Sequence, residues 1–409
     1  MKKDNIVIIA LPMIAFVVVL VLSDFIDLKL FFNQSHDSRN FENDISVEQL
    51  VSKKYNDELE ATFDHYEQIY QEEHSAFKEQ IKFQWGEFKS SSETEWVSYV
   101  DQGNVRRTVA YETGKISVEV LFEESETDKS YIKRKMEKEV FGLLNTTEAS
   151  AFKEDIVSQR VEARLPTNSS VIERGLPNEN RLFSLEDLTS VTFNYSGIVK
   201  VSTKNRNFVN NDVRKAKSTG KKIFRSSFTI HESVLQKAIQ YAESVGKSSQ
   251  KQKIPTALIF AIIESESSFN PMAKSHIPAY GLMQIVPRSA GKDATKHLYG
   301  KAKILAPSYL YSTDNNIKVG SAYLHVLYHK YLRKVKDPQS RIYCAIAAYN
   351  TGATNVARAF IKKKNFNKAV KRINQMTSEE VYQALVKRLP YRETRRYVKK
   401  VSHKMKKYL

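Results

Sequence analysis

The stretch "IIESESSFNP", residues 262–271, places two glutamates two positions apart at the end of an apolar run. The longer stretch "IPTALIFAIIESESSF" predicts a helix that Pro255 opens and that ends before an Asn-Pro pair. On such a helix Glu264 and Glu266 are about 200° apart and cannot share a face. Because a carboxylate is costly to remove from water without compensation, we expect one of the two to be peripheral.

Glu266 occupies the last turn of this predicted helix, where the helix carbonyls present partial negative charge. That position, together with any apolar wall nearby, disfavours ionisation and raises the pKa of the carboxyl. A carboxylic acid that stays protonated near neutral pH can donate a proton to a leaving oxygen. A glutamate near a helix end is more often a solvated or capping group, so both interpretations stay open from this stretch alone.

A second motif, "AYGLMQIVP", follows at residues 279–287. Gly281 permits unusual backbone angles or a close approach of another chain segment, and Gln284 offers both a hydrogen-bond donor and an acceptor. Amides of this kind suit the N-acetyl groups and hydroxyls of a sugar chain. The apolar residues between them are expected to belong to the core.

Two more motifs follow near the C-terminus. In "AAYNTG", residues 347–352, Tyr349 and Asn350 end a helix before a glycine, where helix capping is the alternative to a functional role. In "PYRETRRYV", residues 390–398, the glutamate and the second tyrosine stand at i and i+4 on one helix face. For that pair, an intrahelical contact or support of another side chain is the alternative.

In this order and spacing, the motifs E-S-S-F-N-P, G-L-M-Q, A-Y-N and E-T-R-x-Y resemble the catalytic domain of the lytic murein transglycosylases of the Slt type. The resemblance covers roughly residues 225–409. It selects Glu266 as the catalytic acid, because the family's glutamate directly precedes the Ser-Ser/Ala-x-Asn-Pro run. By the same resemblance, Ser275, Gly281 and Gln284 bind substrate, Tyr349 and Asn350 line the cleft, and Glu393 and Tyr397 hold the catalytic glutamate and the substrate in place.

The resemblance implies an unusual use of one carboxyl group. Ordinary glycosidases use two carboxylates about 5 to 9.5 Å apart. The other acids of the basic half, such as Asp293, Asp314 and Asp337, are interpreted as caps or turns, so we expect the substrate to supply the nucleophile. In the family, Glu266 would protonate the glycosidic oxygen, and a 1,6-anhydro-N-acetylmuramic acid end would form without water. A muramidase and a noncatalytic peptidoglycan-binding scaffold remain the alternatives.

The sequence gives no indication of a cofactor or metal. The nine histidines have no zinc-ligand spacing, and the Gly-Lys-Ser at 246–248 lacks the first glycine of a phosphate loop. The single cysteine, Cys344, lies in an apolar run and is interpreted as a buried structural residue. We therefore expect no cofactor.

The charge of the chain is divided unevenly along its 409 residues. Residues 1–220 carry 28 Lys and Arg against 36 Asp and Glu, net −8, and residues 221–409 carry 36 against 10, net +26, which accounts for the overall +18. Such asymmetry indicates two domains that face different partners. The basic domain would be attracted to nucleic acid, an anionic lipid surface or an acidic wall polymer.

The N-terminal residues reduce the number of possible partners for the basic domain. Two lysines precede seventeen uncharged residues, Ile6–Leu22, which as a helix would span about 25 Å. We expect a secretory signal or, in preference, an uncleaved membrane anchor, which excludes nucleic acid as a partner and leaves peptidoglycan glycan strands and the membrane. The member of the family that the chain most resembles is a lipoprotein. This chain has no cysteine near residues 15–25, so the inner membrane is preferred to the outer membrane.

The predicted organisation has three parts: a signal or anchor at 1–32, an α+β accessory domain at 33–220 and an all-α, lysozyme-like (goose-type/Slt) catalytic domain at 221–409. In the second part, residues 95–124 alternate in polarity and predict a three-stranded antiparallel meander. Residues 205–227, basic and rich in polar residues, are interpreted as a linker. Helices are predicted in the third part, with Gly246 as a helix stop and Asp314 as a helix cap; their expected spans are 232–246, 254–269, 315–332, 338–350 and 378–389.

Overall fold

A computed structural model describes residues 47–183, 191–194, 198–201, 210–215, 221–230, 234–275, 278–361 and 365–409. The chain divides into two compact units, Met1–Lys54 and Tyr55–Leu409. Of the first unit, only 47–54 are described, as the first turns of a long helix. The predicted anchor at Ile6–Leu22 lies outside the described residues, and none of the helices within them is long and apolar enough to span a bilayer.

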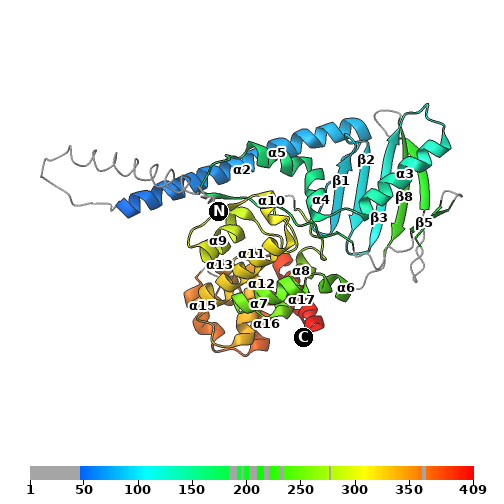
Figure 1. The fold of residues 1–409 in the computed structure, drawn as a ribbon. Helices are drawn as coiled ribbons and strands as arrows, with labels where there is room; N and C mark the ends of the chain where they lie inside the picture. Colours follow the sequence, from blue (N-terminus) through cyan, green and yellow to red (C-terminus); the bar gives the residue numbers. More distant parts are fainter. Residues whose placement is uncertain are drawn as a thin grey trace, which may run out of the picture. The chain divides into compact units, whose positions relative to one another are not determined.

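The first part of the larger unit is built on a five-stranded antiparallel sheet with the order β1-β2-β3-β8-β7 (Figure 1). The predicted meander is confirmed, because residues 95–124 contain β1, β2 and β3. We call residues 55–230 the sheet part. Its elements are α2 (Val47–Trp85, which begins in the first unit), β1 (Glu95–Val100), β2 (Val105–Ala110), β3 (Lys115–Phe122), α3 (Lys129–Leu144), α4 (Glu148–Glu154), α5 (Ile156–Arg164), β4 (Ile172–Glu173), β5 (Val191–Asn194), β6 (Ile198–Val201), β7 (Asn210–Lys215) and β8 (Lys222–Thr229).

Helix α2 covers one face of the sheet. The Trp85 indole donates to the Gly103 carbonyl oxygen at 2.7 Å, and its ring packs edge-on against Tyr99 of β1. On the same face, Arg106 and Glu119 form a buried ion pair at 2.6 Å between neighbouring strands. Burial alone would raise the pKa of Glu119, but the hydrogen bond and charge of Arg106 outweigh it and lower the pKa to about 2. The ion pair of Arg106 and Glu119 therefore belongs to the core of the sheet part.

The opposite face of the sheet is covered by α3 and α4. Arg107 of β2 reaches both helices, with Nη2 2.8 Å from Glu139 of α3 and Nη1 2.8 Å from Glu154 of α4. Alternation along β2 thus sends two successive arginines to opposite faces, each to buried or half-buried carboxylates.

The prediction that residues 205–227 form a linker is wrong. Strands β7 and β8 lie there, and β8 pairs with β3 along its full length, from Lys222 opposite Phe122 to Thr229 opposite Lys115. The basic composition of this segment suggested a solvated linker. In the structure, Arg225 of β8 instead pairs with Glu119, the partner of Arg106. The sheet therefore continues past the boundary that we expected at residue 220.

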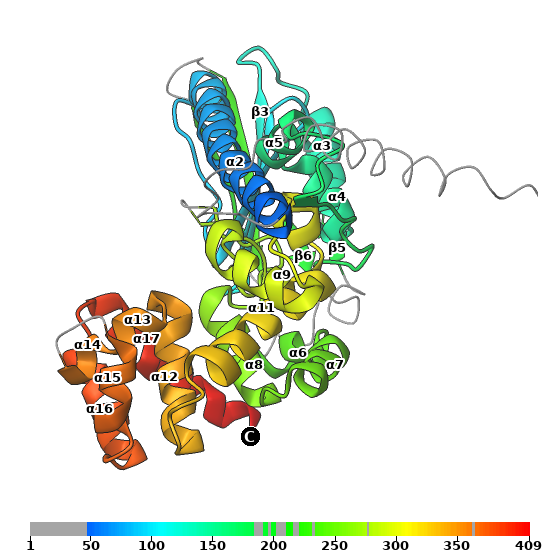
Figure 2. The same cartoon turned by 90° about the vertical axis from the view of Figure 1, so that its left-hand side faces the viewer.

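Residues 234–409, the helical part, surround the apolar helix α8 (Figure 2). The predicted helices at 254–269, 338–350 and 378–389 are present as α8, α12 and α16. The elements are α6 (Val234–Ile239), α7 (Ala242–Gln252), α8 (Thr256–Glu266), a π-helix at Pro287–Gly291, α9 (Lys292–Tyr299), β9 (Ile304–Leu305), α10 (Pro307–Leu310), α11 (Thr313–His325), a π-helix at Val326–Tyr331, α12 (Pro338–Thr351), α13 (Ala353–Val356), α14 (Arg358–Ile361), α15 (Phe366–Ile373), α16 (Ser378–Arg388), α17 (Arg392–Met405) and a 3₁₀ turn at Lys406–Tyr408.

Two predicted helix signals are corrected by the structure. Gly246 lies inside α7, where an added Cβ would meet open space, and the helix ends instead at Lys253 in a left-handed conformation. Asp314 lies in the first turn of α11, and Ser312 takes the N-cap position. A glycine is tolerated within a helix at a modest cost, so it is a weak stop signal.

The sheet part and the helical part are joined by extensive contacts. Acidic residues of α2 meet basic residues of the helical part: Arg288 pairs with Asp64 at 2.6 Å and with Glu67 at 3.2 Å, and Lys292 pairs with Glu60. Strand β4 also pairs in parallel with β9. The charge asymmetry along the sequence is therefore used in part within the chain, which composition alone did not predict.

The most buried of these charged contacts is made by Lys274. Its ammonium lies 3.2 Å from Asp155 Oδ2 and 3.2 Å from Ser158 Oγ, and it stands over the ring of Tyr70. The side chains of Lys274 and Asp155 are only 11% and 18% exposed. Asp155 is also the N-cap of α5, where it accepts the amide of Ser158. The ion pair therefore supports the N-terminal end of this helix as well as the contact between the sheet part and the helical part.

We predict that Lys274→Met lowers the free energy of unfolding by about 3 kcal/mol, because it leaves the half-buried Asp155 carboxylate without its cation. The matched control is Lys247→Met, which removes an i,i+4 pair with Glu243 whose side chains are 75% and 82% exposed. That control should leave the free energy of unfolding nearly unchanged, because the pair is exposed to water. Urea unfolding at neutral pH measures both, and equal effects of the two substitutions would contradict the prediction.

Candidate active site

Helix α8 carries Glu266 as its last residue. Eight of its eleven residues are buried, so the helix lies largely within the core of the helical part. The amide of Ser267 donates to the Ile263 carbonyl oxygen at 3.0 Å and closes the last turn. Ser268 and Phe269 then adopt positive φ values of 53° and 66°, which non-glycine residues rarely do. The chain thus turns sharply directly after Glu266.

The Glu266 carboxyl is half-buried and has one strong hydrogen bond. Tyr397 of α17 donates its hydroxyl to Oε1 at 2.5 Å, and Tyr397 itself is only 8% exposed. Because Oε1 is engaged, Oε2 is the oxygen left to carry or accept a proton. This contact confirms that the two motifs at 262–271 and 390–398 meet in space.

The surroundings of Glu266 favour its neutral form. Burial raises the pKa of Glu266 to about 7, although the Tyr397 hydrogen bond and the positive charge of Lys400 act in the opposite direction. The negative charges of Glu93 and Glu393 add to the increase. A carboxyl with this pKa is present in both forms near neutral pH, so it can act first as an acid and then as a base.

Glu264, the other glutamate of the opening stretch, has a different environment. It accepts hydrogen bonds from Lys407 at 3.0 Å and Tyr408 at 2.9 Å, and Lys404 lies 3.1 Å away. Burial alone would raise the pKa of Glu264, but these hydrogen bonds and the charge of Lys404 outweigh it, so the pKa lies below its ordinary value. Glu264 is therefore an ionised anchor for the C-terminal residues rather than a proton donor.

The loop of the second motif is shaped by Asn316, which the sequence analysis did not select. Asn316 of α11 donates to the carbonyl oxygens of Tyr280 at 2.8 Å and Leu310 at 2.9 Å, and it accepts the amide of Met283 at 2.9 Å. Gly281 has φ 73°, and a Cβ there would lie 2.3 Å from Asn316 Nδ2. Both roles foreseen for this glycine, unusual backbone angles and close approach, are therefore present.

Gln284 ends this tight turn and presents an unused acceptor. Its φ is 46°, its amide nitrogen donates to the Gly281 carbonyl oxygen at 3.2 Å, and the residue is 8% exposed. Within the described part of the chain, Gln284 Oε1 is buried and has no hydrogen-bond partner. A buried acceptor without a donor is unfavourable, so this oxygen is suited to an N–H or O–H group of a ligand.

The remaining predicted residues form a chain of contacts around Glu266. Tyr349 donates its hydroxyl to the Met283 carbonyl oxygen at 2.7 Å, and so ties α12 to the Gly281–Gln284 turn. The amide of Asn350 donates to Glu393 Oε1 at 3.3 Å. Helix α12 ends at Thr351, so these two residues stand at a helix end, as predicted. Within the described residues, Glu393 and Tyr397 of α17 do not hydrogen-bond to each other: Glu393 accepts from Asn350, and Tyr397 donates to Glu266.

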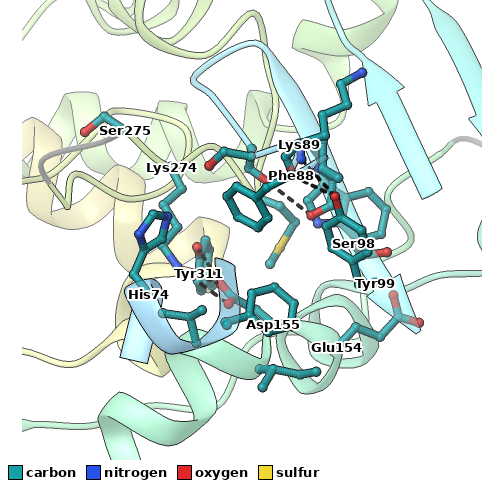
Figure 3. A pocket seen from close by; sticks show the side chains of 18 of the residues that line it. His74, Phe88, Lys89, Ser98, Tyr99, Glu154, Asp155, Lys274, Ser275 and Tyr311 are labelled. Carbon is teal, nitrogen blue, oxygen red and sulfur yellow. Dashed lines mark hydrogen bonds and ion pairs between the residues drawn. The ribbon is translucent and has the colours of Figure 1, made fainter. Parts of the chain in front are cut away.

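Ser275 is placed differently. Its hydroxyl accepts the amide of Ala279 at 3.2 Å, and it lies at the rim of a pocket between the sheet part and the helical part (Figure 3). The pocket is lined by aromatic and polar residues of both parts, among them Phe88, Asp155 and Tyr311. No contact within the described residues joins Ser275 to Glu266, so the structure brings together the other predicted residues more closely than this one.

The described residues include no group of three or more His, Cys, Asp or Glu side chains arranged to hold a metal ion. Cys344 is fully buried in α12, and burial raises the pKa of its thiol to about 12. Its role as a buried structural residue, expected from the sequence, is confirmed.

Comparison with known proteins identifies the helical part. Residues 243–371 match the family model described as "Transglycosylase SLT domain". Over 172 residues the chain is 44% identical to proteins named membrane-bound lytic murein transglycosylase C from Sodalis glossinidius and from Klebsiella pneumoniae, which is 42% of this chain and 47% of each relative. The chain thus spans about half the length of the curated relatives that it matches. The resemblance predicted from the four motifs is confirmed for this segment.

Solved structures were matched over a similar length. Lytic transglycosylase Slt from Pseudomonas aeruginosa is 24% identical, with a TM-score of 0.33, over 42% of this chain and 24% of that chain. The 70 kDa soluble lytic transglycosylase of Escherichia coli is 26% identical, with a TM-score of 0.32, over 41% and 24%.

The raised pKa of Glu266 leads to a prediction about stability. A carboxyl whose pKa is about 7 in the folded chain, against an ordinary value of 4.5, stabilises the fold fully below the ordinary value and ceases to do so as the pH rises through 7. Glu266→Gln removes this dependence. Relative to the unchanged chain, its free energy of unfolding should therefore gain about 3 kcal/mol between pH 4 and pH 9, measured by urea unfolding.

Glu264→Gln is the control for this experiment, with the opposite sign. Because the pKa of Glu264 is lowered, its stabilisation is present above the ordinary pKa and lost in acid. The substitution should therefore cost stability at neutral pH and cost nothing in strong acid. Parallel pH dependences for the Glu266→Gln variant and the unchanged chain would contradict the assignment of Glu266 as a neutral, desolvated acid.

Proposed function

We propose that this chain is a lytic peptidoglycan transglycosylase that cleaves the β-1,4 bond between N-acetylmuramic acid and N-acetylglucosamine and leaves 1,6-anhydro-N-acetylmuramic acid ends. The observation that carries the proposal is the half-buried Glu266 carboxyl, with a pKa near 7 and a hydrogen bond from Tyr397. The SLT domain match and the names of the curated relatives support it. The proposal extends to the whole chain a relationship seen over part of it.

The first step uses Glu266 as a general acid. The proton on Oε2 moves to the glycosidic oxygen, and the bond from that oxygen to C1 of N-acetylmuramic acid breaks. The acetamido oxygen at C2 of the same sugar attacks C1, which replaces the nucleophilic carboxylate of ordinary retaining glycosidases. Tyr397 stabilises the Glu266 carboxylate that remains, because its hydroxyl already donates to Oε1.

The second step uses the same carboxylate as a base. It accepts the proton of the C6 hydroxyl, O6 attacks C1, and the bond from C1 to the acetamido oxygen breaks. The acetamido group is restored, the 1,6-anhydro ring is closed, and Glu266 is protonated again. No water enters the balance, so the reaction is a lyase-type cleavage. The assignment of the anhydro product rests on the family resemblance, and a single group with a pKa near 7 is suited to both transfers.

The other residues are proposed to hold the sugar chain. Gln284 offers its unpaired Oε1 to an N–H or hydroxyl of the substrate, and Gly281 allows the turn that aims it. Tyr349 and Asn350 would line the cleft beside the scissile bond, with Glu393 held by Asn350. Ser275 is proposed to contact a more distant part of the substrate, in keeping with its place at the rim of the pocket in Figure 3.

Hydrolysis of the same bond is the second candidate. A muramidase needs a carboxylate that activates water, and the charges of Glu93 and Glu393 both act on Glu266. Neither is buried, and Glu393 is engaged by Asn350, so substrate assistance is preferred. A noncatalytic peptidoglycan-binding scaffold is the third candidate, and it requires no neutral acid at all.

We further propose a place in the cell envelope, with residues 1–32 as a signal or anchor, an α+β accessory domain that begins at residue 33 and extends through β8 to residue 230 instead of ending at 220, and a catalytic domain in the residues that follow. The curated relatives are named as membrane-bound, which agrees with an envelope location. The apolar segment Ile6–Leu22 favours attachment to the inner membrane through that segment. Separation of the inner and outer membranes followed by immunodetection of the chain would test this proposal.

We predict that the purified chain releases anhydro-muropeptides from peptidoglycan, that Glu266→Gln lowers the rate by at least about 10³-fold, and that the variant still binds peptidoglycan. Glu264→Gln is the matched control and should retain most of the activity, because Glu264 faces the C-terminal residues. Mass analysis of the products separates the candidates. Reducing ends would favour the muramidase, binding without cleavage would favour the scaffold, and full activity of Glu266→Gln would refute the assignment.

A further inference from the structure

Residues 280–285 form the turn that carries Gln284, and we call them the Gln284 turn. Tyr280 and Ile285 close its base: the Tyr280 amide donates to the Ile285 carbonyl oxygen at 3.1 Å, and the Ile285 amide donates to the Tyr280 carbonyl oxygen at 3.0 Å. Between them, Gly281 and Gln284 have positive φ values. The direction in which Gln284 presents its Oε1, which has no partner among the described residues, therefore depends on where Tyr280 is held.

The side chain of Tyr280 is held from the sheet part. Tyr66 of α2 donates its hydroxyl to the Tyr280 hydroxyl at 2.7 Å, and the two residues are 2% and 0% exposed. Lys274, which pairs with Asp155, places its ammonium 5.9 Å from the centre of the Tyr280 ring. Tyr311 packs edge-on against the same ring at 5.4 Å. A side chain of α2 thus reaches the base of a turn in the helical part through a hydrogen bond hidden from water.

The remaining hydrogen bonds of the Gln284 turn come from the helical part. Asn316 binds the Tyr280 carbonyl oxygen and the Met283 amide, and Tyr349 donates to the Met283 carbonyl oxygen. Among the residues that the structure describes, Tyr66 is the one hydrogen-bond partner of the Tyr280 hydroxyl. Because a buried hydroxyl without a partner is unfavourable, loss of the Tyr66 hydroxyl would favour a shift of the base of the turn.

We propose that Tyr66 is a positioning residue for substrate binding: its hydrogen bond to Tyr280 sets the Gln284 turn so that Gln284 Oε1 meets an N–H or O–H group of the sugar chain. Tyr66 is buried, so it acts through Tyr280 and not by contact with the substrate. The inference rests on the proposed function for the identity of the ligand, but it concerns a residue in a different part of the chain.

The expected kinetics follow from this route. Gln284 is proposed to hold the sugar chain both before and during cleavage, so a misplaced Gln284 weakens binding of the substrate and of the transition state alike. Tyr66→Phe should therefore raise KM about 5-fold and change kcat by less than about 2-fold. The hydrogen bond of Tyr397 to Glu266 is not involved. A loss of folded protein would instead lower the apparent kcat and leave KM unchanged.

The test measures KM and kcat for anhydro-product formation by the full chain on soluble glycan fragments of peptidoglycan at neutral pH. Tyr55→Phe is the matched control. Tyr55 lies on the same helix and also donates its hydroxyl to the helical part, to the Ala302 carbonyl oxygen at 2.7 Å, but this bond does not involve the Gln284 turn. The control should leave KM in place. Urea unfolding of both variants records how much stability each substitution removes.

A double-mutant cycle shows whether Tyr66 acts through Gln284. Calorimetry measures binding of the same fragments to the full chain with Glu266→Gln, which should not cleave them. In that background Tyr66→Phe should weaken binding about 5-fold when Gln284 is present and by less than about 2-fold after Gln284→Ala.

Three results would overturn the proposal: equal losses of affinity from Tyr66→Phe with and without Gln284, no loss of affinity from Gln284→Ala, or the same rise of KM in Tyr55→Phe as in Tyr66→Phe. An unchanged chain that binds the fragments but forms no anhydro products would instead contradict the proposed function. The two failures are therefore distinguishable.

Discussion

The site depends on one desolvated carboxyl, that of Glu266 at the end of α8. Glu266 is the last residue of the apolar helix, and the chain turns sharply after it at Ser268 and Phe269, where φ is positive. The Tyr397 hydroxyl satisfies one of its oxygens without supplying a positive charge. A cation at this place would favour the ionised carboxyl, as at the neighbouring Glu264, whose partners Lys404, Lys407 and Tyr408 lower its pKa.

Helix α17 therefore serves two glutamates of α8 in opposite ways. Through Tyr397 it supports a neutral carboxyl, and through Lys404 and the residues that follow it holds an ionised one. The helical period explains this division, because residues two apart on α8 point in directions about 200° apart and meet different parts of α17. Lys404, Lys407 and Tyr408 thus hold the end of the helix that carries the proposed catalytic acid.

Much of this arrangement was predictable from local pattern. The apolar run and the Asn-Pro pair after it predicted α8. The position of Glu266 in the last turn, with apolar residues nearby, predicted a raised pKa. Gly281 predicted unusual backbone angles, and its φ is positive. Asn316 was missed because an asparagine inside a helix carries no signal of a partner at 280–283. Strands β7 and β8 were missed because Arg225 looks like a linker residue until Glu119 of a distant strand is placed beside it. Contacts between distant segments were what the sequence could not provide.

The same limit applies to the acidic residues near Glu266, which come from both parts of the chain. Glu393 belongs to residues 221–409, whereas Glu93 belongs to the sheet part, in a loop whose carbonyl oxygens accept from Asn270 and Lys274. A reaction that uses one carboxyl as both acid and base needs a pKa close to the working pH, since a stronger acid is a weak base and the reverse. Burial alone tends to overshoot in one direction, and a cation alone in the other. At Glu266 burial has the largest effect and raises the pKa; the Tyr397 hydrogen bond and the charge of Lys400 act against it, and the charges of Glu93 and Glu393 act with it.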